Sequence, residues 1–314
     1  MNFVLHGTTL ALAWFLAVNL TASAFVAWIS TRPLRTMSPA FWFAVRILPA
    51  CAAALFVAAV FMPSYWRYEP RDTTEGFDLT LTACAVAAAV LLAGAGIRGL
   101  LAWRRAASRV QLWLHAARPL CLTPTIKSFE VDSERPLMAL AGVIRPRLIV
   151  TRGLMAALSE DELASCVSHE LGHWHAWDNL KRLVMRASPD VLIGTSTARE
   201  IERRWASAAE HAADDVAGYH GAAARCALAS ALVKVAKLIP DRAVLTEPIS
   251  TLVGGGDVAS RVRRLLDDRT LAPSSARRRG WIASAAAVVA IGAMYGPLLH
   301  AVHHATELLV QTLP

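Results

Sequence analysis

Long apolar segments constrain this chain of 314 residues more than any other feature of its sequence. Hydrophobic residues make up 55% of it and charged residues only 18%, which is more apolar than a soluble domain of this length needs. Four segments are long enough to cross about 30 Å of hydrocarbon as helices. They are residues 4–29, 41–62, 79–103 and 281–302. The sequence therefore predicts an α-helical membrane protein with four transmembrane helices.

The positions of these segments divide the chain into three parts. Residues 1–103 hold three spans, residues 104–280 form one large domain, and residues 281–314 hold the fourth span and a short tail. Ala22-Ser-Ala24 resembles a signal-peptide cleavage site, but no Lys or Arg precedes the apolar run, which continues to Ile29. We therefore expect the first segment to be retained as a span.

Arginines at the ends of the segments orient the chain. Arg104, Arg105 and Arg109 follow the third span, and three arginines at residues 277–279 precede the fourth. Because basic flanks stay on the cytoplasmic side, we expect the large domain in the cytoplasm of a bacterial cell and both termini outside the plasma membrane. Arg46, near one end of the second segment, is interpreted as a side chain that snorkels to the nearer interface.

The basic excess, 32 basic against 24 acidic residues, is explained by these membrane flanks. We therefore expect the lipid bilayer as a partner and no direct nucleic-acid binding. The helix-like stretch Val258–Asp268 carries Arg261, Arg263 and Arg264 and is interpreted as a face toward solvent or lipid headgroups. The five scattered cysteines form no CxxC pair, which fits a reducing compartment.

The sequence His-Glu-Leu-Gly-His at residues 169–173 points to metal chemistry. On a helix, residues four apart project from one face, so His169 and His173 can bind a single ion. Catalytic zinc commonly takes three protein ligands and keeps a fourth position for water. Glu170 would lie beside that water, where its carboxylate can accept a proton as the water attacks a carbonyl. We predict one Zn²⁺ per chain and a zinc-dependent metalloendopeptidase.

The third ligand has four candidates, Glu210, His211, His175 and His220. Glu210 and Asp214 are four residues apart in a stretch without Gly or Pro, so a second helix could offer Glu210 to the metal. Asp214, on the same face, could bind the outer ring nitrogen of a ligand histidine. His175 and His211 point away from the ligand faces of their helices. We favour Glu210.

The large domain is expected to combine a small sheet with longer helices. Predicted strands cover residues 125–131 and a hairpin of 137–143 and 148–151, and predicted helices cover Ser159–Asp178, Arg199–Ala217 and Ala222–Leu238. Ser159 and Glu162 have the spacing of a capping box. The layout predicts a cytoplasmic α+β zincin-like (gluzincin) domain, in which substrate commonly pairs with an exposed strand edge.

Several blocks resemble a known family. Residues 169–180, His-Glu-Leu-Gly-His-Trp-His-Ala-Trp-Asp-Asn-Leu, are similar to the HELxHxxxxDNL block of the BlaR/MecR-type membrane metallopeptidases. Residues 142–154, 158–163, 210–214 and 262–266 are similar to other blocks of that family. The resemblance covers about residues 120–304.

The resemblance implies roles for the residues and a substrate. By it, His169, His173 and Glu210 are zinc ligands and Glu170 is the catalytic base. It also implies signal transduction by cleavage of a protein substrate, a cytoplasmic transcriptional repressor of the BlaI/MecI kind. Members that sense β-lactams carry a penicillin-binding domain after the last span, and since the sequence stops at Pro314 we do not expect direct antibiotic sensing.

Two alternatives and one gap stay open. HtpX-type and CAAX-prenyl-type membrane peptidases share HExxH and ExxxD, so a quality-control or processing peptidase is the first alternative. A membrane signal transducer without proteolytic activity is the second. The group that steadies the oxyanion of the intermediate is not evident; Tyr219, His220 and Arg225 are candidates by residue type.

Overall fold

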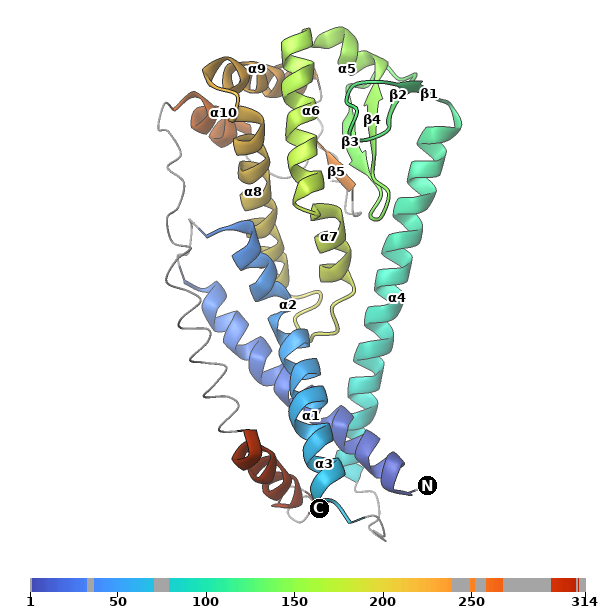
Figure 1. Ribbon diagram of the computed structural model, residues 1–314, viewed down its shortest axis with the longest axis vertical. Helices are drawn as coiled ribbons and strands as arrows, with labels where there is room; N and C mark the ends of the chain where they lie inside the picture. Colours follow the sequence, from blue (N-terminus) through green and yellow to red (C-terminus); the bar gives the residue numbers. More distant parts are fainter. Residues whose placement is uncertain are drawn as a thin grey trace.

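The computed structural model describes residues 2–32, 37–70, 79–238, 249–251, 258–267, 295–308 and 310. Long apolar helices occupy one end of the elongated molecule, and a small sheet with shorter helices occupies the other (Figure 1). Both termini lie at the end formed by the long helices.

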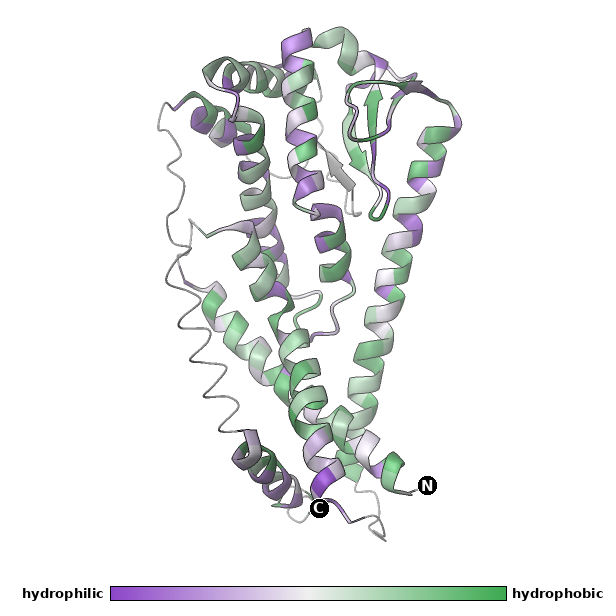
Figure 2. Ribbon diagram, in the orientation of Figure 1, coloured by the Kyte–Doolittle hydropathy of each residue, from purple (hydrophilic) through white to green (hydrophobic). Residues whose placement is uncertain are grey.

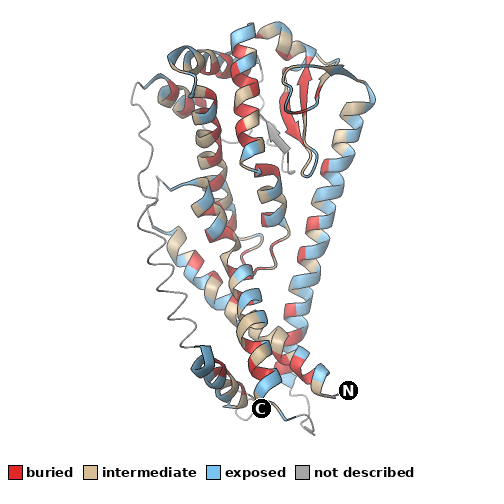
Figure 3. Cartoon of the chain, viewed as in Figure 1, coloured by how far each residue is buried: buried red, intermediate tan, exposed pale blue. Residues whose placement is uncertain are grey.

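Among the described residues, three helical segments are long and apolar enough to cross a membrane: Phe3–Ser30, Pro39–Tyr68 and Leu79–His115. The first lies in α1 (Asn2–Ser30), the second is continuous through α2 (Pro39–Phe56), η1 (Val57–Phe61) and α3 (Met62–Tyr68), and the third is α4 (Leu79–His115). Their apolar windows are only 28%, 33% and 22% buried within the chain, which leaves large hydrophobic faces for lipid. Figures 2 and 3 show these helices as largely hydrophobic and exposed. Three predicted spans therefore fold as expected.

The fourth predicted span, residues 281–302, lies largely outside the described residues. Residues 295–308 are helical and lie beside α3 and η1, since Ser64 Oγ donates a hydrogen bond to Leu299 O at 2.7 Å and Tyr295 Oη to Ala59 O at 2.6 Å. The count of four spans stays a prediction. The third span is longer than predicted, because α4 continues past Trp103 to His115 and leads into the sheet.

The described residues form a sheet of five strands in the order β1-β2-β4-β3-β5. They are β1 (Ala117–Leu120), β2 (Ser128–Val131), β3 (Met138–Ala141), β4 (Arg147–Thr151) and β5 (Ile249–Thr251). β2 and β4 are parallel, whereas the other neighbours are antiparallel, and the predicted β3–β4 hairpin is confirmed. β5 pairs with Ala139–Ala141, so this edge of β3 is covered by another strand there.

In the described part of the chain, six helices accompany the sheet. They are α5 (Arg152–Ala157), α6 (Glu160–His175), α7 (Asp178–Arg186), α8 (Ser196–Gly218), α9 (Ala222–Leu238) and α10 (Val258–Leu266). The capping box at the start of α6 is present: Ser159 Oγ accepts from Glu162 N at 3.4 Å, and a Glu162 carboxylate oxygen accepts from Ser159 N at 2.8 Å. The predicted helix Ser159–Asp178 ends early because Trp177 adopts a left-handed conformation, φ 57°, and separates α6 from α7.

The main hydrophobic core joins the sheet to the helices. Its buried side chains come from β3, β4, α5, α6, α8, α9 and α10, and they include Met138, Leu148, Val150, Leu154, Cys166, Ala217, Leu228, Leu232 and Leu265. Removing this apolar surface from water is the main force that holds the helices against the sheet. α6 therefore has a fixed position between the sheet on one side and α8 and α9 on the other.

Arg46 of α2 does not snorkel to the membrane surface. Its side chain is 0% exposed, and Nη1 lies 2.6 Å from Asp190 Oδ2 while Nε donates to Glu202 Oε1 at 3.0 Å. Asp190 belongs to the α7–α8 connection, residues 187–195, and Glu202 lies in α8. The interpretation was wrong because a buried carboxylate, Asp190, and a partly buried one, Glu202, compensate the arginine, so its charge needs no water.

The other two long helices contact the same connection through polar side chains. Asn19 of α1 donates to Pro189 O at 2.8 Å and accepts from Val191 N at 3.3 Å. Arg98 of α4 donates to Ser188 O at 3.2 Å. All three long helices therefore bind the segment that joins α7 to α8.

Candidate metal centre

Helices α6 and α8 bring three potential metal ligands together. His169 and His173 project from one face of α6, and Glu210 projects from α8. His169 Nε2 lies 3.5 Å from Glu210 Oε2, and His173 Nε2 lies 3.6 Å from Glu210 Oε1. All three side chains are fully buried, and their donor atoms lie within 4.8 Å of one another. The structure thus unites the two histidines with the favoured third ligand.

Gly172 allows the two helices to approach closely. A Cβ atom at this position would lie 3.0 Å from Ala213 Cα and 3.3 Å from Ala213 Cβ, both on α8. Contacts that short are rare, so any larger residue would push α6 and α8 apart. Gly172 lies between Glu170 and His173, which makes the glycine of the motif part of the geometry of the site.

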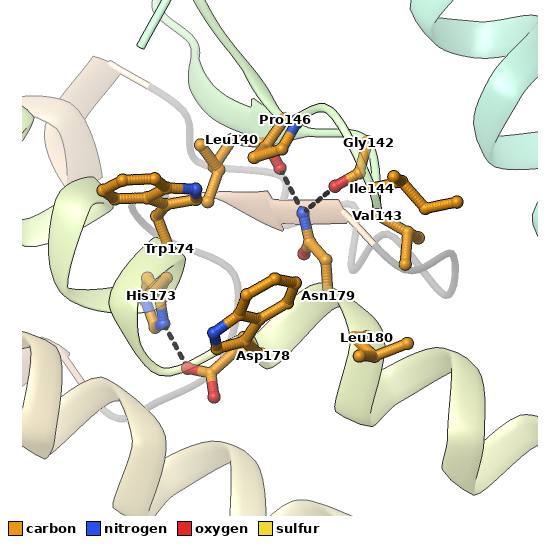
Figure 4. A pocket seen from close by; sticks show the side chains of 11 residues that line it. Leu140, Gly142, Val143, Ile144, Pro146, His173, Trp174, Asp178, Asn179 and Leu180 are labelled. Atoms are coloured by element: carbon orange, nitrogen blue, oxygen red, sulfur yellow. Dashed lines mark hydrogen bonds and ion pairs between the residues drawn. The ribbon is translucent and has the colours of Figure 1, made fainter. Parts of the chain in front are cut away.

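Carboxylates bind the outer nitrogen of each histidine ring. His169 Nδ1 lies 3.0 Å from Asp214 Oδ1, as the spacing of Glu210 and Asp214 suggested. His173 Nδ1 lies 2.7 Å from Asp178 Oδ2, a contact drawn as a dashed line in Figure 4. Such contacts favour the neutral ring that carries its single N–H proton on Nδ1, which leaves Nε2 free to bind a metal. Both Nε2 atoms face Glu210.

The turn between α6 and α7 places Asp178. Trp177 is the only non-glycine residue with positive φ in the described part of the chain. This turn brings Asp178 back toward the preceding helix, and Asn179 then donates to Leu140 O at 2.9 Å and to Gly142 O at 3.0 Å (Figure 4). The Asp-Asn pair of the motif therefore fixes a histidine and ties α7 to β3. In the sequence, this pair stood out only as part of the family resemblance, which predicted neither role.

Arg261 of α10 belongs to the site, contrary to the interpretation of this helix as a face toward solvent or lipid. Its side chain is 1% exposed; Nη1 lies 2.9 Å from Glu210 Oε2, and Nη2 lies 2.6 Å from Asp214 Oδ1. Arg264 lies 2.7 Å from Asp215 and is also turned toward α8. Arg261 and Arg264 pair with acidic residues of α8, which draws them into the domain, whereas Arg263 is exposed as expected. The amphipathic spacing of Val258, Val262 and Leu265 was the available signal that one face packs inward.

Burial and charge together shift the pKa values at the site. Burial lowers the pKa of His169, but Asp214 and Glu210 outweigh it and raise this pKa to about 9. Burial raises the pKa of Glu210, but His169, His173 and Arg261 outweigh it and lower this pKa to about 2. Burial also raises the pKa of Glu170, an effect that the two histidines oppose. Glu170 thus has the higher proton affinity of the two glutamates, as suits proton transfer.

The donor set fits a zinc ion. Two imidazole nitrogens and one carboxylate oxygen are common ligands of catalytic zinc. Within the described ranges, His173 Nε2 and Glu210 Oε1 are buried without a hydrogen-bond partner. Buried polar atoms without partners are costly, and a shared cation would satisfy both.

Residues 122–239 match peptidase family M48. The match supports membership of this metallopeptidase family and indicates a protease with a protein substrate. It runs from just before β2 to the end of α9 and includes His169, Glu170, His173, Asp178, Glu210 and Asp214. The family is generally zinc-dependent. No curated protein matches the chain.

The other candidate residues lie away from the metal ligands of the M48 domain, the matched region of residues 122–239. The Tyr219 side chain is 86% exposed and His220 is also exposed, so neither points toward the buried histidines. Arg225 packs over Gly218, one turn past the site on α8. His175 is exposed and contacts Leu171 O through Nδ1 at 2.7 Å. The structure brings none of the three oxyanion candidates to the metal group.

A pocket opens beside His173 in the M48 domain (Figure 4). It lies between the β3–β4 turn and the start of α7, and its walls are mostly apolar. The lining residues are Leu140, Gly142, Val143, Ile144, Pro146, His173, Trp174, Trp177, Asp178, Asn179 and Leu180. An apolar pocket next to a metal ligand suits a hydrophobic side chain of a peptide.

Proposed function

We propose that the chain is an integral membrane zinc endopeptidase with His169, His173 and Glu210 as ligands of one zinc ion. The observation that carries this proposal is the buried convergence of these three residues with Glu170 on the same turn of α6. Asp214 and Asp178 orient the two imidazoles, and Arg261 holds the carboxylates of Glu210 and Asp214.

Glu170 is the general base in this proposal. Zinc bound at the site would polarise the peptide carbonyl and lower the pKa of water to near 7. Glu170 takes a proton from the attacking water and delivers it to the leaving amide nitrogen. Its burial raises its pKa toward the range in which a carboxyl group can both accept and release a proton.

We further propose that the peptidase signals, by cleaving a cytoplasmic repressor of the BlaI/MecI kind. The contacts of all three long helices with the α7–α8 connection support this role, because a change among the spans would act directly on the helix that holds Glu210. This proposal requires the M48 domain to face the cytoplasm, as the basic flanks predict. A soluble cytoplasmic repressor can be cleaved only in that orientation.

The test compares repressor fragments in cells that express the full chain or Glu170→Gln with a candidate BlaI-like repressor. Glu170→Gln is expected to lower cleavage at least about 100-fold, because an amide cannot accept the proton. Zinc content should stay unchanged, since Glu170 is not a ligand in the proposal. Glu160→Gln is the matched control, the same substitution at an exposed position of the first turn of α6.

Other outcomes of this experiment point to the alternatives. An intact repressor together with Glu170-dependent degradation of misfolded membrane proteins would replace signalling by an HtpX-like quality-control role. A response to inducer that survives Glu170→Gln unchanged would overturn the peptidase mechanism and favour a transducer without proteolytic activity.

A further inference from the structure

A second group of potential metal ligands lies at the opposite end of the molecule from the HExxH helix. Among the described residues, two groups of three His, Cys, Asp or Glu side chains have donor atoms within 4.8 Å of one another. One is the HExxH centre, and the other consists of Glu69, His303 and Glu307. Glu69 follows α3, and the other two lie on the helix of residues 295–308, drawn in red near the C-terminus in Figure 1.

The spacing within this group repeats that of the first. His303 and Glu307 are four residues apart on one helix and share a face, as His169 and His173 do. His303 Nδ1 lies 3.9 Å from Glu69 Oε2, which is too long for a hydrogen bond. Atoms that each bind one zinc ion at about 2.1 Å lie at most about 4.2 Å apart, so this separation suits two ligands of a common ion.

The side chains of the group are sheltered. The Glu69 side chain is 5% exposed and that of His303 is 22% exposed. The Tyr68 ring stacks on the His303 ring with centroids 5.5 Å apart and an interplanar angle of 29°. A surface cluster of acids would leave its side chains in water, whereas here a carboxylate and an imidazole are held together under an aromatic ring.

The backbone that carries these ligands is anchored by contacts outside the group. Trp14 of α1 donates to Thr306 Oγ1 at 3.2 Å, one residue before Glu307. The hydrogen bonds from Ser64 and Tyr295 tie the same helix to the second span. The ligand positions are therefore fixed by three segments from distant parts of the sequence, which preorganises the group.

We propose that Glu69, His303 and Glu307 form a second binding site, for a divalent transition-metal ion of the zinc class. One imidazole and two carboxylates are a donor set for such ions, and the two negative charges match a doubly charged cation. The bound ion joins the end of the second span to the helix of residues 295–308. This site does not depend on the proposed function, because it shares no residue with the HExxH centre.

The experiment removes the first site in order to observe the second. The full chain is purified in lipid nanodiscs as the wild type and as His169→Ala/His173→Ala, loaded with Zn²⁺, desalted and analysed for zinc and protein. We expect about two zinc ions per chain in the wild type and about one in the double variant. Adding His303→Ala should remove that ion, whereas adding His304→Ala, at the exposed neighbouring position, should not.

A second variant separates loss of binding from loss of fold. Glu307→Gln keeps the size of a half-buried side chain and should weaken Zn²⁺ binding in the double-variant background at least about tenfold, measured against a competing chelator. A double variant that binds no zinc would overturn the proposal, as would binding that is unchanged by both His303→Ala and Glu307→Gln. Because the HExxH histidines are absent from every variant that tests the second site, these results do not depend on peptidase activity.

Discussion

Arg261 is not a proposed metal ligand, yet its removal should disturb the metal centre strongly. It pairs with Glu210 and Asp214, and the side chains of all three residues are about 1% exposed. Arg261→Met would leave two buried carboxylates without this cation, and breaking a buried ion pair in this way costs about 3–5 kcal/mol. We expect this loss in the free energy of unfolding, measured by denaturant titration of the solubilised chain.

The control for Arg261 lies on the same helix. Arg264 pairs with Asp215, and both side chains are about one third exposed, at 31% and 37%. Pairs of this kind contribute about 1 kcal/mol or less, so Arg264→Gln should have a small effect. Equal stability of Arg261→Met and the wild type would show that the guanidinium is not needed to stabilise the buried carboxylates.

The role of an individual residue could be predicted when the sequence pattern that identifies it lies within one or two helical turns. His169 and His173 could be predicted from spacing alone, because residues four apart on a helix share a face, and Glu170 from its place between them. Arg261 could not be assigned in this way, since its partners lie on α8, 47 residues earlier for Asp214. A basic residue is usually solvated, and only the fold shows that its charge is compensated inside the domain.

At the scale of elements, Glu162 joins two helices as well as capping one. Besides its bond with Ser159, it accepts hydrogen bonds from Ser230 Oγ at 2.6 Å and from Lys234 Nζ at 2.7 Å, both on α9. Burial raises the pKa of Glu162, but the bonds from Lys234, Ser230 and the Ser159 backbone outweigh it and lower this pKa to about 2. The capping carboxylate therefore also fixes α9 against α6.

This lowered pKa makes stability depend on pH in a defined direction. The stabilisation by Glu162 is fully present above its ordinary pKa of 4.5 and is lost as the pH falls through about 2. Its size is at most about 3 kcal/mol, because Lys234 is half in water. Glu162→Gln should thus be less stable than the wild type at pH 7, and this difference should shrink toward pH 2.

Thermal unfolding of the two proteins across pH 2–7 measures that difference. Asp161→Asn, at the exposed neighbouring position, should follow the wild type closely. A difference between Glu162→Gln and the wild type that stays constant from pH 7 to pH 2 would contradict a role for the carboxylate charge.

Elements were predictable where the pattern is regular and local. α6 begins at its predicted cap, and the β3–β4 hairpin lies where two apolar runs flank a turn. The break at Trp177 was missed because a tryptophan with positive φ is unfavourable by itself. Contacts of the next two residues compensate for this conformation. Asp178 contacts His173 of α6, and Asn179 donates a hydrogen bond to Leu140 O of β3.

For the whole molecule, hydropathy identified the three long helices, because lipid requires continuous apolar helices of a certain length. It could not show how the spans contact the M48 domain. Arg46 and Asp190 are 144 residues apart in the sequence. Until such a partner is known, a charged residue in an apolar segment is interpreted as one that lies at the membrane interface. Asn19, Arg46 and Arg98 therefore connect the long helices to the domain.

Arg46 should accordingly stabilise the whole chain. Arg46→Leu would leave Asp190, which is 0% exposed, without its cation and should destabilise the chain by about 3–5 kcal/mol. Arg46→Leu/Asp190→Leu removes both charges and should recover part of that loss, because an apolar pair needs no compensation. The measurement is denaturant unfolding in nanodiscs, with Arg203→Gln as the control on an exposed pair of α8.

The same variants test whether the spans hold α8 in place. Because Arg46 also binds Glu202, on the helix that carries Glu210, Arg46→Leu should lower the affinity of the HExxH centre for zinc more than Arg203→Gln does. If the double variant is as unstable as Arg46→Leu, the loss comes from packing of α2 rather than from the buried charge. If zinc affinity is unchanged while stability falls, the contact anchors the domain to the spans without influencing the geometry of its metal ligands.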